Sequence, residues 1–200
     1  MFSEAARRGV ITVVDMLIAH APQLDINRIT HFNGGPSFTP LKWAIRGMHT
    51  AVISRMLADP RLVVRDNGAN EMFAAVGKRF SCFINNDPPC SENDQTRLDV
   101  LQLLLQDTRF QIDARDFLTQ MTVLHYAVWE GRTDIAYFLL ESGLVNVNSH
   151  SGVEAILHTA MRRKMDDISR VLLRCPGIQV QPDSLIRRVC RVHLSSQQCL

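Results

Sequence analysis

A pattern of apolar residues in the second half of this chain returns after 33 residues. Residues 123–143 read VLHYAVWEGRTDIAYFLLESG, and residues 156–177 read ILHTAMRRKMDDISRVLLRCPG. The group Leu124-His125-x-Ala127 reappears as Leu157-His158-x-Ala160. Self-similarity at a fixed period of about 20 to 50 residues is typical of solenoids, in which one small unit stacks on the next. The chain is therefore expected to fold as a stack of similar units.

Each unit is expected to hold two short helices. In the first copy, Leu124, Ala127 and Val128 form one apolar helical stripe, and the run Ile135 to Leu140 forms a second. Gly131 stands between the two stripes, where a tight turn is needed. Helices shorter than about 12 residues are marginal in water, so each pair must be stabilised by packing on its neighbours.

Three upstream segments carry the same pattern. They are AARRGVITVVDMLI (5–18), TPLKWAIRGMHTAVISRML (39–57), and NEMFAAV (70–76) followed by LDVLQLLLQ (98–106). With these segments the chain resembles the ankyrin repeat family, whose signature is T-P-L-H-x-A. The resemblance implies an all-α fold: one ankyrin-repeat solenoid over residues 1–200, with about five helix-turn-helix units and hairpin fingers. We expect units at 1–27, 28–66, 67–116 with an insertion at 77–96, 117–149 and 150–180, then a capping segment at 181–200 that begins its helix near Asp183.

Several signature positions have a simple physical role. Thr39 and Thr122 are expected to cap the first helix of their units, and Pro40 suits a first helical turn because its missing N–H would be unpaired there. Lys164 stands where the family keeps its turn glycine, Lys42 replaces the usual histidine, and Val123 and Ile156 replace proline. Units with such departures should be less stable than a consensus repeat.

The insertion at 77–96, GKRFSCFINNDPPCSENDQT, separates the two helices of the third unit. Its apolar residues Phe80, Phe83 and Ile84 are expected to prolong the first helix. The run Asp87-Pro88-Pro89 must end that helix, and Ser91 is expected to cap the next one.

Composition and cysteine usage limit the class of protein. The chain is 46% hydrophobic, yet its apolar runs are far shorter than the roughly 20 residues needed to cross a bilayer. Asp15 interrupts the N-terminal apolar stretch, which we interpret as an amphipathic helix and not a signal peptide. Five cysteines without CxxC spacing argue against a disulfide framework or a zinc site. We therefore expect a monomer in the reducing cytoplasm, without membrane contact.

The charge is uneven along the chain. The net charge is only +2, but residues 161–191 hold eight Arg or Lys against three Asp, a net charge of +5. This segment is either a basic face for nucleic acid or an acidic partner, or solvated helix surface. No aromatic interleaving or nucleic-acid motif accompanies the charge, so we favour solvated surface and do not expect nucleic acid as the partner.

The residue types that often carry catalysis are better explained by structure here. His125 and His158 are expected on equivalent faces of successive units, about 10 Å apart, which is too far for a shared metal ion. Cys82 and Cys90 in the insertion are interpreted as plain thiols, because no nucleophile signature surrounds them. The motifs GxxxxGK[ST], GxGxxG, HExxH and GxSxG are absent. We expect no enzyme activity, cofactor or metal.

The resemblance implies a protein-interaction module that binds a partner with the concave face made by its fingers and first helices. The positions that vary in the family, together with the tip of the fourth finger, are expected to meet the partner: Arg46, Phe117, Leu118, Trp129, Glu130, Arg162 and Arg163. Trp129 is the main hot-spot candidate, since Trp, Tyr and Arg dominate interface energies. The other interpretation packs Trp129 on Tyr126 or on a neighbouring helix. Trp43 and Tyr126 are assigned to the core.

Two further expectations come from resemblance alone. The segment Leu140-x5-Asn146-Val147-Asn148 is similar to the pattern L-x5-D-V-N, which asparaginyl hydroxylases modify in ankyrin fingers, so Asn148 is a candidate hydroxylation site. The degenerate units and the long insertion are similar to ankyrin effectors that intracellular bacteria deliver into the host cytosol or nucleus. In that alternative, the chain targets a larger effector or enzyme whose catalytic domain lies outside these 200 residues.

Overall fold

The computed structural model describes residues 1–31, 37–77, 94–117, 119–151 and 154–179. Within these ranges, ten α-helices follow one another as five helix pairs. The first helices of the pairs are α1 (Phe2–Arg8), α3 (Pro40–Arg46), α5 (Ala69–Val76), α7 (Val123–Glu130) and α9 (Ile156–Arg162). The second helices are α2 (Ile11–His20), α4 (Thr50–Leu57), α6 (Asp94–Leu105), α8 (Thr133–Glu141) and α10 (Asp166–Arg174).

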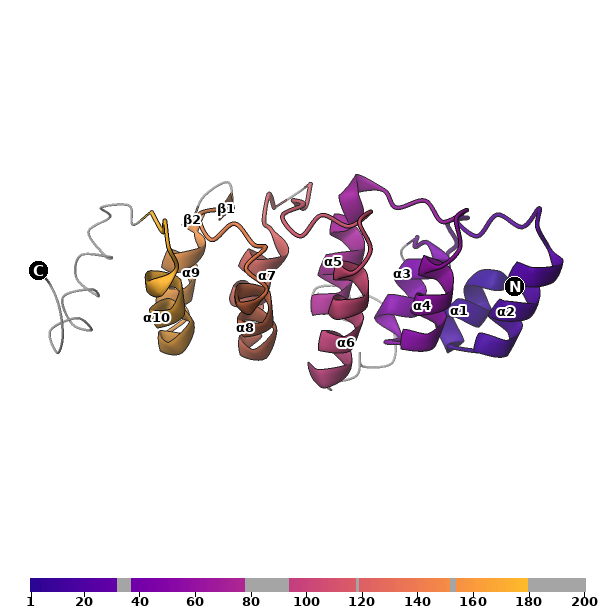
Figure 1. The fold of residues 1–200 in the computed structure, drawn as a ribbon, viewed down its shortest axis with the longest axis horizontal. Coiled ribbons are helices and arrows are strands. Elements are labelled where there is room, and N and C mark those ends of the chain that lie inside the picture. Colours follow the sequence, from indigo (N-terminus) through magenta and orange to yellow (C-terminus); the bar gives the residue numbers. More distant parts are fainter. Residues whose placement is uncertain (32–36, 78–93, 118, 152–153, 180–200) are drawn as a thin grey trace, which may run out of the picture.

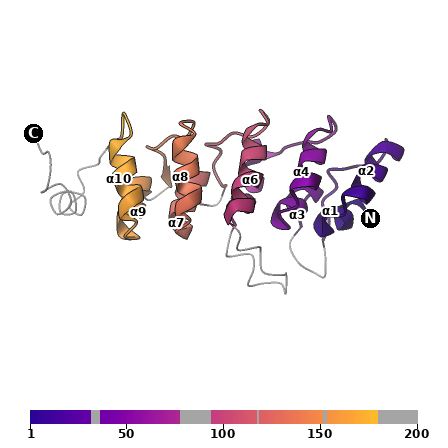
Figure 2. The same ribbon diagram turned by 60° about the horizontal axis from the view of Figure 1, so that its bottom comes forward.

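The pairs stand side by side in one row, which runs from the N-terminal to the C-terminal end of the molecule (Figure 1). Each first helix packs against the first helix of the next pair, and the second helices stack in the same way. Figure 2 shows the second helices as one layer in front of the first helices. The predicted all-α solenoid of helix-turn-helix units is confirmed, and within the described ranges no helix is long and apolar enough to cross a membrane.

Hairpin fingers connect successive pairs on one side of the row. In the fifth finger, β1 (His150–Ser151) pairs antiparallel with β2 (Glu154–Ala155). In the second finger, an isolated bridge joins Thr30 to Phe38. A short 3-10 helix, η1 (Asp66–Gly68), precedes α5. These fingers place the residues just before each first helix on the same side of the molecule.

Local sequence signals explain where the helices begin and turn. The hydroxyl of Thr39 accepts a hydrogen bond from the Lys42 N–H, and the hydroxyl of Thr122 accepts one from the His125 N–H, which confirms both predicted caps. The turn inside each pair needs a left-handed residue, and Gly9 and Gly131 supply it with φ of 72° and 73°. Met48 and Lys164 occupy the same conformation, at φ of 55° and 58°. These two side chains are strained there, as the missing glycine predicts.

The core lies between the two layers of helices. Fully buried alanines on the first helices let neighbouring units approach closely: Ala44, Ala75, Ala127 and Ala160. Trp43 and Tyr126 are each only 4% exposed, which confirms their assignment to the core. The Tyr126 ring meets the Phe73 ring edge-on at 5.1 Å between centroids, so aromatic contacts also cross from one unit to the next.

The third unit departs from the prediction for its insertion. Helix α5 ends at Val76, where Gly77 takes a left-handed conformation with φ of 90°, so the helix does not continue into the insertion. A side chain at Gly77 would collide with the guanidinium of Arg97, a buried residue of α6. Helix α6 already begins at Asp94, inside the range assigned to the insertion. The predictions for Phe80, Phe83, Ile84 and Ser91, and that for the capping segment 181–200 with Asp183, lie outside the described residues.

Two aspartate–arginine pairs tie the second helices of the first three units together. Arg61 pairs with Asp59 at 2.8 Å and donates to the backbone oxygens of Pro22 and Ile18 at 2.9 and 3.3 Å. Arg109 pairs with Asp107 at 2.5 Å and donates to the oxygens of Leu57 and Leu62 at 2.6 and 3.0 Å. Each guanidinium thereby binds carbonyl groups at or just beyond the end of the preceding second helix, where positive charge is favourable. In the fourth unit, Ser142 occupies the position of the aspartate and Leu144 that of the arginine, so the pair is not repeated there.

Candidate protein-interaction face

The fingers and the solvent-exposed sides of the first helices form one face of the solenoid, here called the inner face. Trp129 lies on it, in the last turn of α7, and is half-buried. Arg162 ends α9 and Arg163 caps it, and their guanidinium carbons lie 5.1 and 5.3 Å from the centroid of the Trp129 ring. The structure therefore brings together three of the predicted residues, from two neighbouring units.

In this cluster Trp129 packs on side chains of the neighbouring helix α9, and its contact with a partner stays a prediction. The indole is partly covered, but by arginine side chains of the next unit, while Tyr126 packs on Phe73. A guanidinium over an exposed aromatic ring contributes about 0.5 to 1 kcal/mol, so Trp129 holds both cations loosely in place. Both arginines remain exposed to solvent, and a partner can contact the ring edge and the guanidinium groups at once.

Glu130, the next predicted residue, is bound within its own helix. The Tyr126 hydroxyl donates to its carboxylate at 3.1 Å. Burial of the phenol, together with the negative charge of Glu130, raises the pKa of Tyr126, so the hydroxyl stays a donor at neutral pH. Glu130 is half-buried, and it marks the acidic edge of the Trp129 cluster.

Among the described residues of the fingers, Phe117 is the most exposed large apolar side chain, with 88% of its surface accessible. Its turn is shaped by Asp116, whose carboxylate accepts hydrogen bonds from the N–H and the hydroxyl of Thr119, both at 2.8 Å. Phe117 precedes α7, whereas Trp129 is in its last turn, so the length of the helix, about 10 Å, separates the two. Phe117 and Trp129 therefore stand at opposite ends of α7, and their joint contact with a partner stays a prediction. Leu118 lies outside the described residues.

Arg46 lies two units away from Trp129, in the last turn of α3, and belongs to a second cationic cluster. Its guanidinium carbon is 5.0 Å from the centroid of the Phe38 ring, and the Lys42 ammonium is 4.6 Å from the same centroid. The Trp43 ring supports Phe38 edge-on at 4.9 Å. Sequence reasoning missed Phe38 and Lys42. Lys42 and Arg46 are four residues apart on one helix face, but Phe38 stands before the helix, so the spacing alone does not place its ring beside them.

Two histidines connect neighbouring units. His125 is fully buried, and its Nε2 lies 3.0 Å from the Thr159 hydroxyl of the next unit. This contact joins the fourth unit to the fifth through two side chains. His49 shows the backbone version, with Nε2 3.0 Å from the Arg7 oxygen. The described residues contain no group of His, Cys, Asp or Glu side chains that could hold a metal ion.

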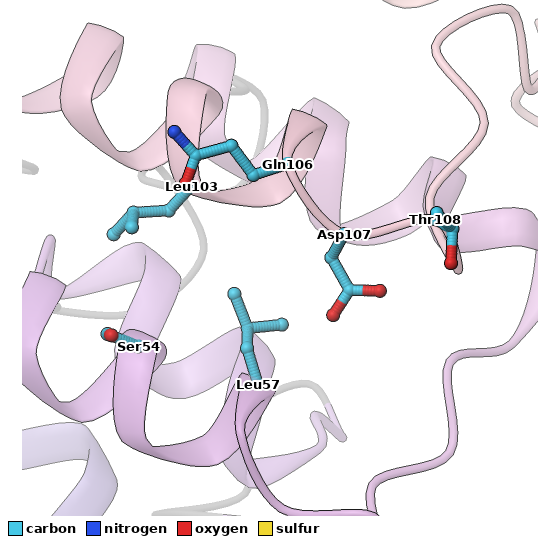
Figure 3. A pocket seen from close by; sticks show the side chains of 6 residues that line it. All are labelled: Ser54, Leu57, Leu103, Gln106, Asp107 and Thr108. Carbon is cyan, nitrogen blue, oxygen red and sulfur yellow. The ribbon is translucent and has the colours of Figure 1, made fainter.

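Other parts of the described structure offer little for catalysis. A shallow hollow lies between the C-terminal ends of α4 and α6, with Leu57 and Leu103 beside it (Figure 3). Its one carboxylate, Asp107, is held by Arg109. Burial raises the pKa of the Cys175 thiol, which is the opposite of nucleophile activation. Cys82 and Cys90 lie outside the described residues.

Asn148, the candidate hydroxylation site, bridges two fingers. Its side-chain amide donates to the Gly177 oxygen at 2.8 Å, and its side-chain oxygen accepts from the Gln179 N–H at 2.7 Å. Asn27 makes the same pair of bonds at the other end of the chain, to the Arg61 oxygen and the Val63 N–H. These bonds give Asn148 a structural role, and its hydroxylation stays a prediction.

Comparison with known proteins agrees with this architecture. Residues 90–183 match the family model of ankyrin repeats, in three copies. A search among curated proteins gives no match.

Proposed function

Because the chain is an ankyrin-repeat protein, we propose that it binds a protein partner through its inner face, with the Trp129 cluster as the main contact. Ankyrin repeats are generally protein–protein interaction modules. The observation that carries the proposal is the half-buried indole with two exposed arginines over its ring. Trp and Arg at one point are the residue types that dominate interface energies when a partner removes them from water.

The rest of the inner face supports the same proposal. Phe117 projects from the fourth finger with most of its surface in solvent, and Arg46 lies over Phe38 in the second unit. These points come from different units, so a partner that spans several units can contact them together. Ankyrin repeats are typically non-catalytic, and we propose that this chain acts by binding alone. We further propose that it does so as a monomer inside a cell.

Capture from a eukaryotic cell lysate tests this proposal. The native chain is compared with Trp129→Asp and with a control, Met16→Asp. Met16 is 61% exposed on the second helix α2, so the control carries the same new charge away from the inner face. Captured proteins are then purified, and their dissociation constants for the three chains are measured.

We expect Trp129→Asp to weaken partner binding by about a hundredfold, which corresponds to about 2.7 kcal/mol and is typical of an interface hot spot. Met16→Asp should bind like the native chain. Partners that bind all three chains equally would place the interface elsewhere and refute the proposed function. Circular dichroism of each variant confirms that the fold is intact.

A further inference from the structure

The third finger, which leads into α5, contains an asparagine followed directly by a glycine. Asn67 and Gly68 both have a left-handed backbone, with φ of 54° and 76°. Asn67 is exposed to solvent, whereas Gly68 is buried. A Cβ atom at Gly68 would collide with the ring of Phe110, a buried residue at the start of the fourth finger. The fold therefore requires glycine directly after an exposed asparagine.

An asparagine in front of a glycine can deamidate without an enzyme, because glycine has no side chain that shields its backbone nitrogen. In this reaction the Gly68 nitrogen attacks the side-chain carbon Cγ of Asn67, and a five-membered succinimide ring forms. The side-chain nitrogen leaves as ammonia and takes up the proton of the attacking N–H. Water then adds to one of the two ring carbonyls and opens the ring to aspartate or isoaspartate. Water is the only co-reactant, and the Asn67 side chain is in contact with it.

The folded finger keeps the two reacting atoms apart. With ψ of 27° at Asn67, the Gly68 nitrogen lies nearly opposite the side chain about the Cα–C bond of Asn67. The Gly68 N–H also donates to the Arg65 oxygen at 2.9 Å. Ring closure requires rotation of the backbone at Asn67. That rotation also moves the Asn67 oxygen away from the Gln111 N–H, which donates to it at 2.9 Å.

We propose that Asn67 is a deamidation site that the folded third finger keeps closed and that local opening of this finger exposes to reaction. Phe110 and Gln111 hold the finger closed, since one packs on Gly68 and the other binds the Asn67 oxygen. Refolding cannot reverse the reaction. Both products carry a new carboxylate beside Asp66, and isoaspartate adds a carbon atom to the backbone, which displaces the carbonyl that Gln111 binds. The site therefore records openings between the second and third units.

Peptide mapping by mass spectrometry measures the reaction in the full chain, incubated at mildly alkaline pH with and without guanidinium chloride. The second Asn-Gly pair of the sequence, Asn33-Gly34, is the reference in the unfolded chain. In denaturant we expect Asn67 and Asn33 to react at rates within about threefold of each other, because no folded structure protects either. In the folded chain Asn67 should react at least about tenfold more slowly than in denaturant, since only the opened fraction reacts.

Three variants locate the opening. Phe110→Ala removes the ring that packs on Gly68, and Arg109→Met removes the guanidinium that binds the Leu57 and Leu62 oxygens of the second unit. Each should speed the reaction of Asn67 in the folded chain at least about threefold, because each raises the opened fraction. The control is Ile168→Ala, which removes a buried side chain of α10 in the fifth unit and should change the rate less than about twofold.

Circular dichroism shows which variants fold, and Arg109→Met decides the comparison if Phe110→Ala does not. Three results would overturn the inference. They are equal rates at Asn67 in the folded and the unfolded chain, no reaction at Asn67 in denaturant where Asn33 reacts, and a rate in Arg109→Met no higher than that in Ile168→Ala. The measurement needs no partner, so the proposed function is tested separately and can survive each of these results.

Discussion

Replacing Arg109 with methionine tests whether the aspartate–arginine pairs hold the stack together. Methionine keeps most of the apolar stem and removes the guanidinium, which donates to the Leu57 and Leu62 oxygens and pairs with Asp107. A hydrogen bond that involves a charged group contributes about 1.5 to 3 kcal/mol, and the partly buried site favours the lower end for each of the two carbonyl bonds. The expected loss in the free energy of unfolding is about 3 kcal/mol.

The assay is urea unfolding followed by circular dichroism, with Arg55→Met as the control. Arg55 pairs with Asp15 at 2.8 Å, but both side chains are more exposed, at 35% and 51%, and such surface pairs contribute about 0 to 1 kcal/mol. Equal losses for the two variants would refute the reasoning, because they would mean that the carbonyl bonds of Arg109 add nothing. An unchanged stability of Arg109→Met would refute it as well.

The Arg109→Met variant should also change how the stability of the chain depends on pH. The hydrogen bond from Arg109 lowers the pKa of Asp107 in the folded chain. A carboxyl with a lowered folded-state pKa contributes stability that is present above its unfolded pKa, about 3.9, and is lost as pH falls through the folded value. Native stability should therefore fall more steeply below about pH 4 than that of Arg109→Met, and parallel curves would contradict the assignment.

Four other substitutions should change stability in stated directions, measured by the same urea unfolding. Lys164→Gly removes the backbone strain of a lysine in the left-handed conformation and should stabilise the chain by about 0.5 to 1 kcal/mol. Met48→Gly at the same turn position also removes a buried side chain and should destabilise the chain. Burial raises the pKa of Glu71, so the stability of the native chain should decrease as pH rises from the unfolded pKa of this carboxyl to its folded pKa. The variant Glu71→Gln should lack this decrease and be more stable than the native chain at pH 7. A pH profile that the substitution leaves unchanged would refute the assignment. The Asp113 carboxylate accepts a hydrogen bond from the Asn146 N–H but lacks the amide donor that Asn27 and Asn148 use to bind the next finger. Asp113→Asn should therefore raise the free energy of unfolding by about 0.5 to 1.5 kcal/mol. A decrease would show that this finger does not form the same pair of hydrogen bonds.

Local patterns made much of the fold predictable. A threonine before an apolar helix start, as at Thr39 and Thr122, can satisfy a free backbone N–H using only neighbours along the chain. The turn position held by Gly131 in one unit and Lys164 in the next is likewise a local requirement of the backbone. The insertion was harder: helix α5 ends at Val76, where Gly77 is left-handed and close to Arg97, and a contact across 20 residues cannot be predicted from a local pattern.

The candidate interaction face was only partly predictable. The equivalence of repeats placed Arg46, Trp129 and Arg162 on one face, because each position returns with the unit. That Arg162 and Arg163 lie on Trp129, and that Phe38 carries Arg46 and Lys42, depends on side-chain directions that a one-dimensional pattern does not contain. Phe117 and Trp129 lie at opposite ends of helix α7, and a shared contact with a partner stays a prediction.

The sequence by itself determined that this chain is a stack of helix pairs, since a repeat of 33 residues with short amphipathic stripes has no other way to bury its apolar faces. Only the tertiary structure decided which residues of different units meet. Arg109 finds the Leu57 oxygen across 52 residues, and Arg162 reaches a ring on the neighbouring helix. Such contacts depend on the distance and rotation between stacked units, which are set by the packing of the whole array and not by any one segment.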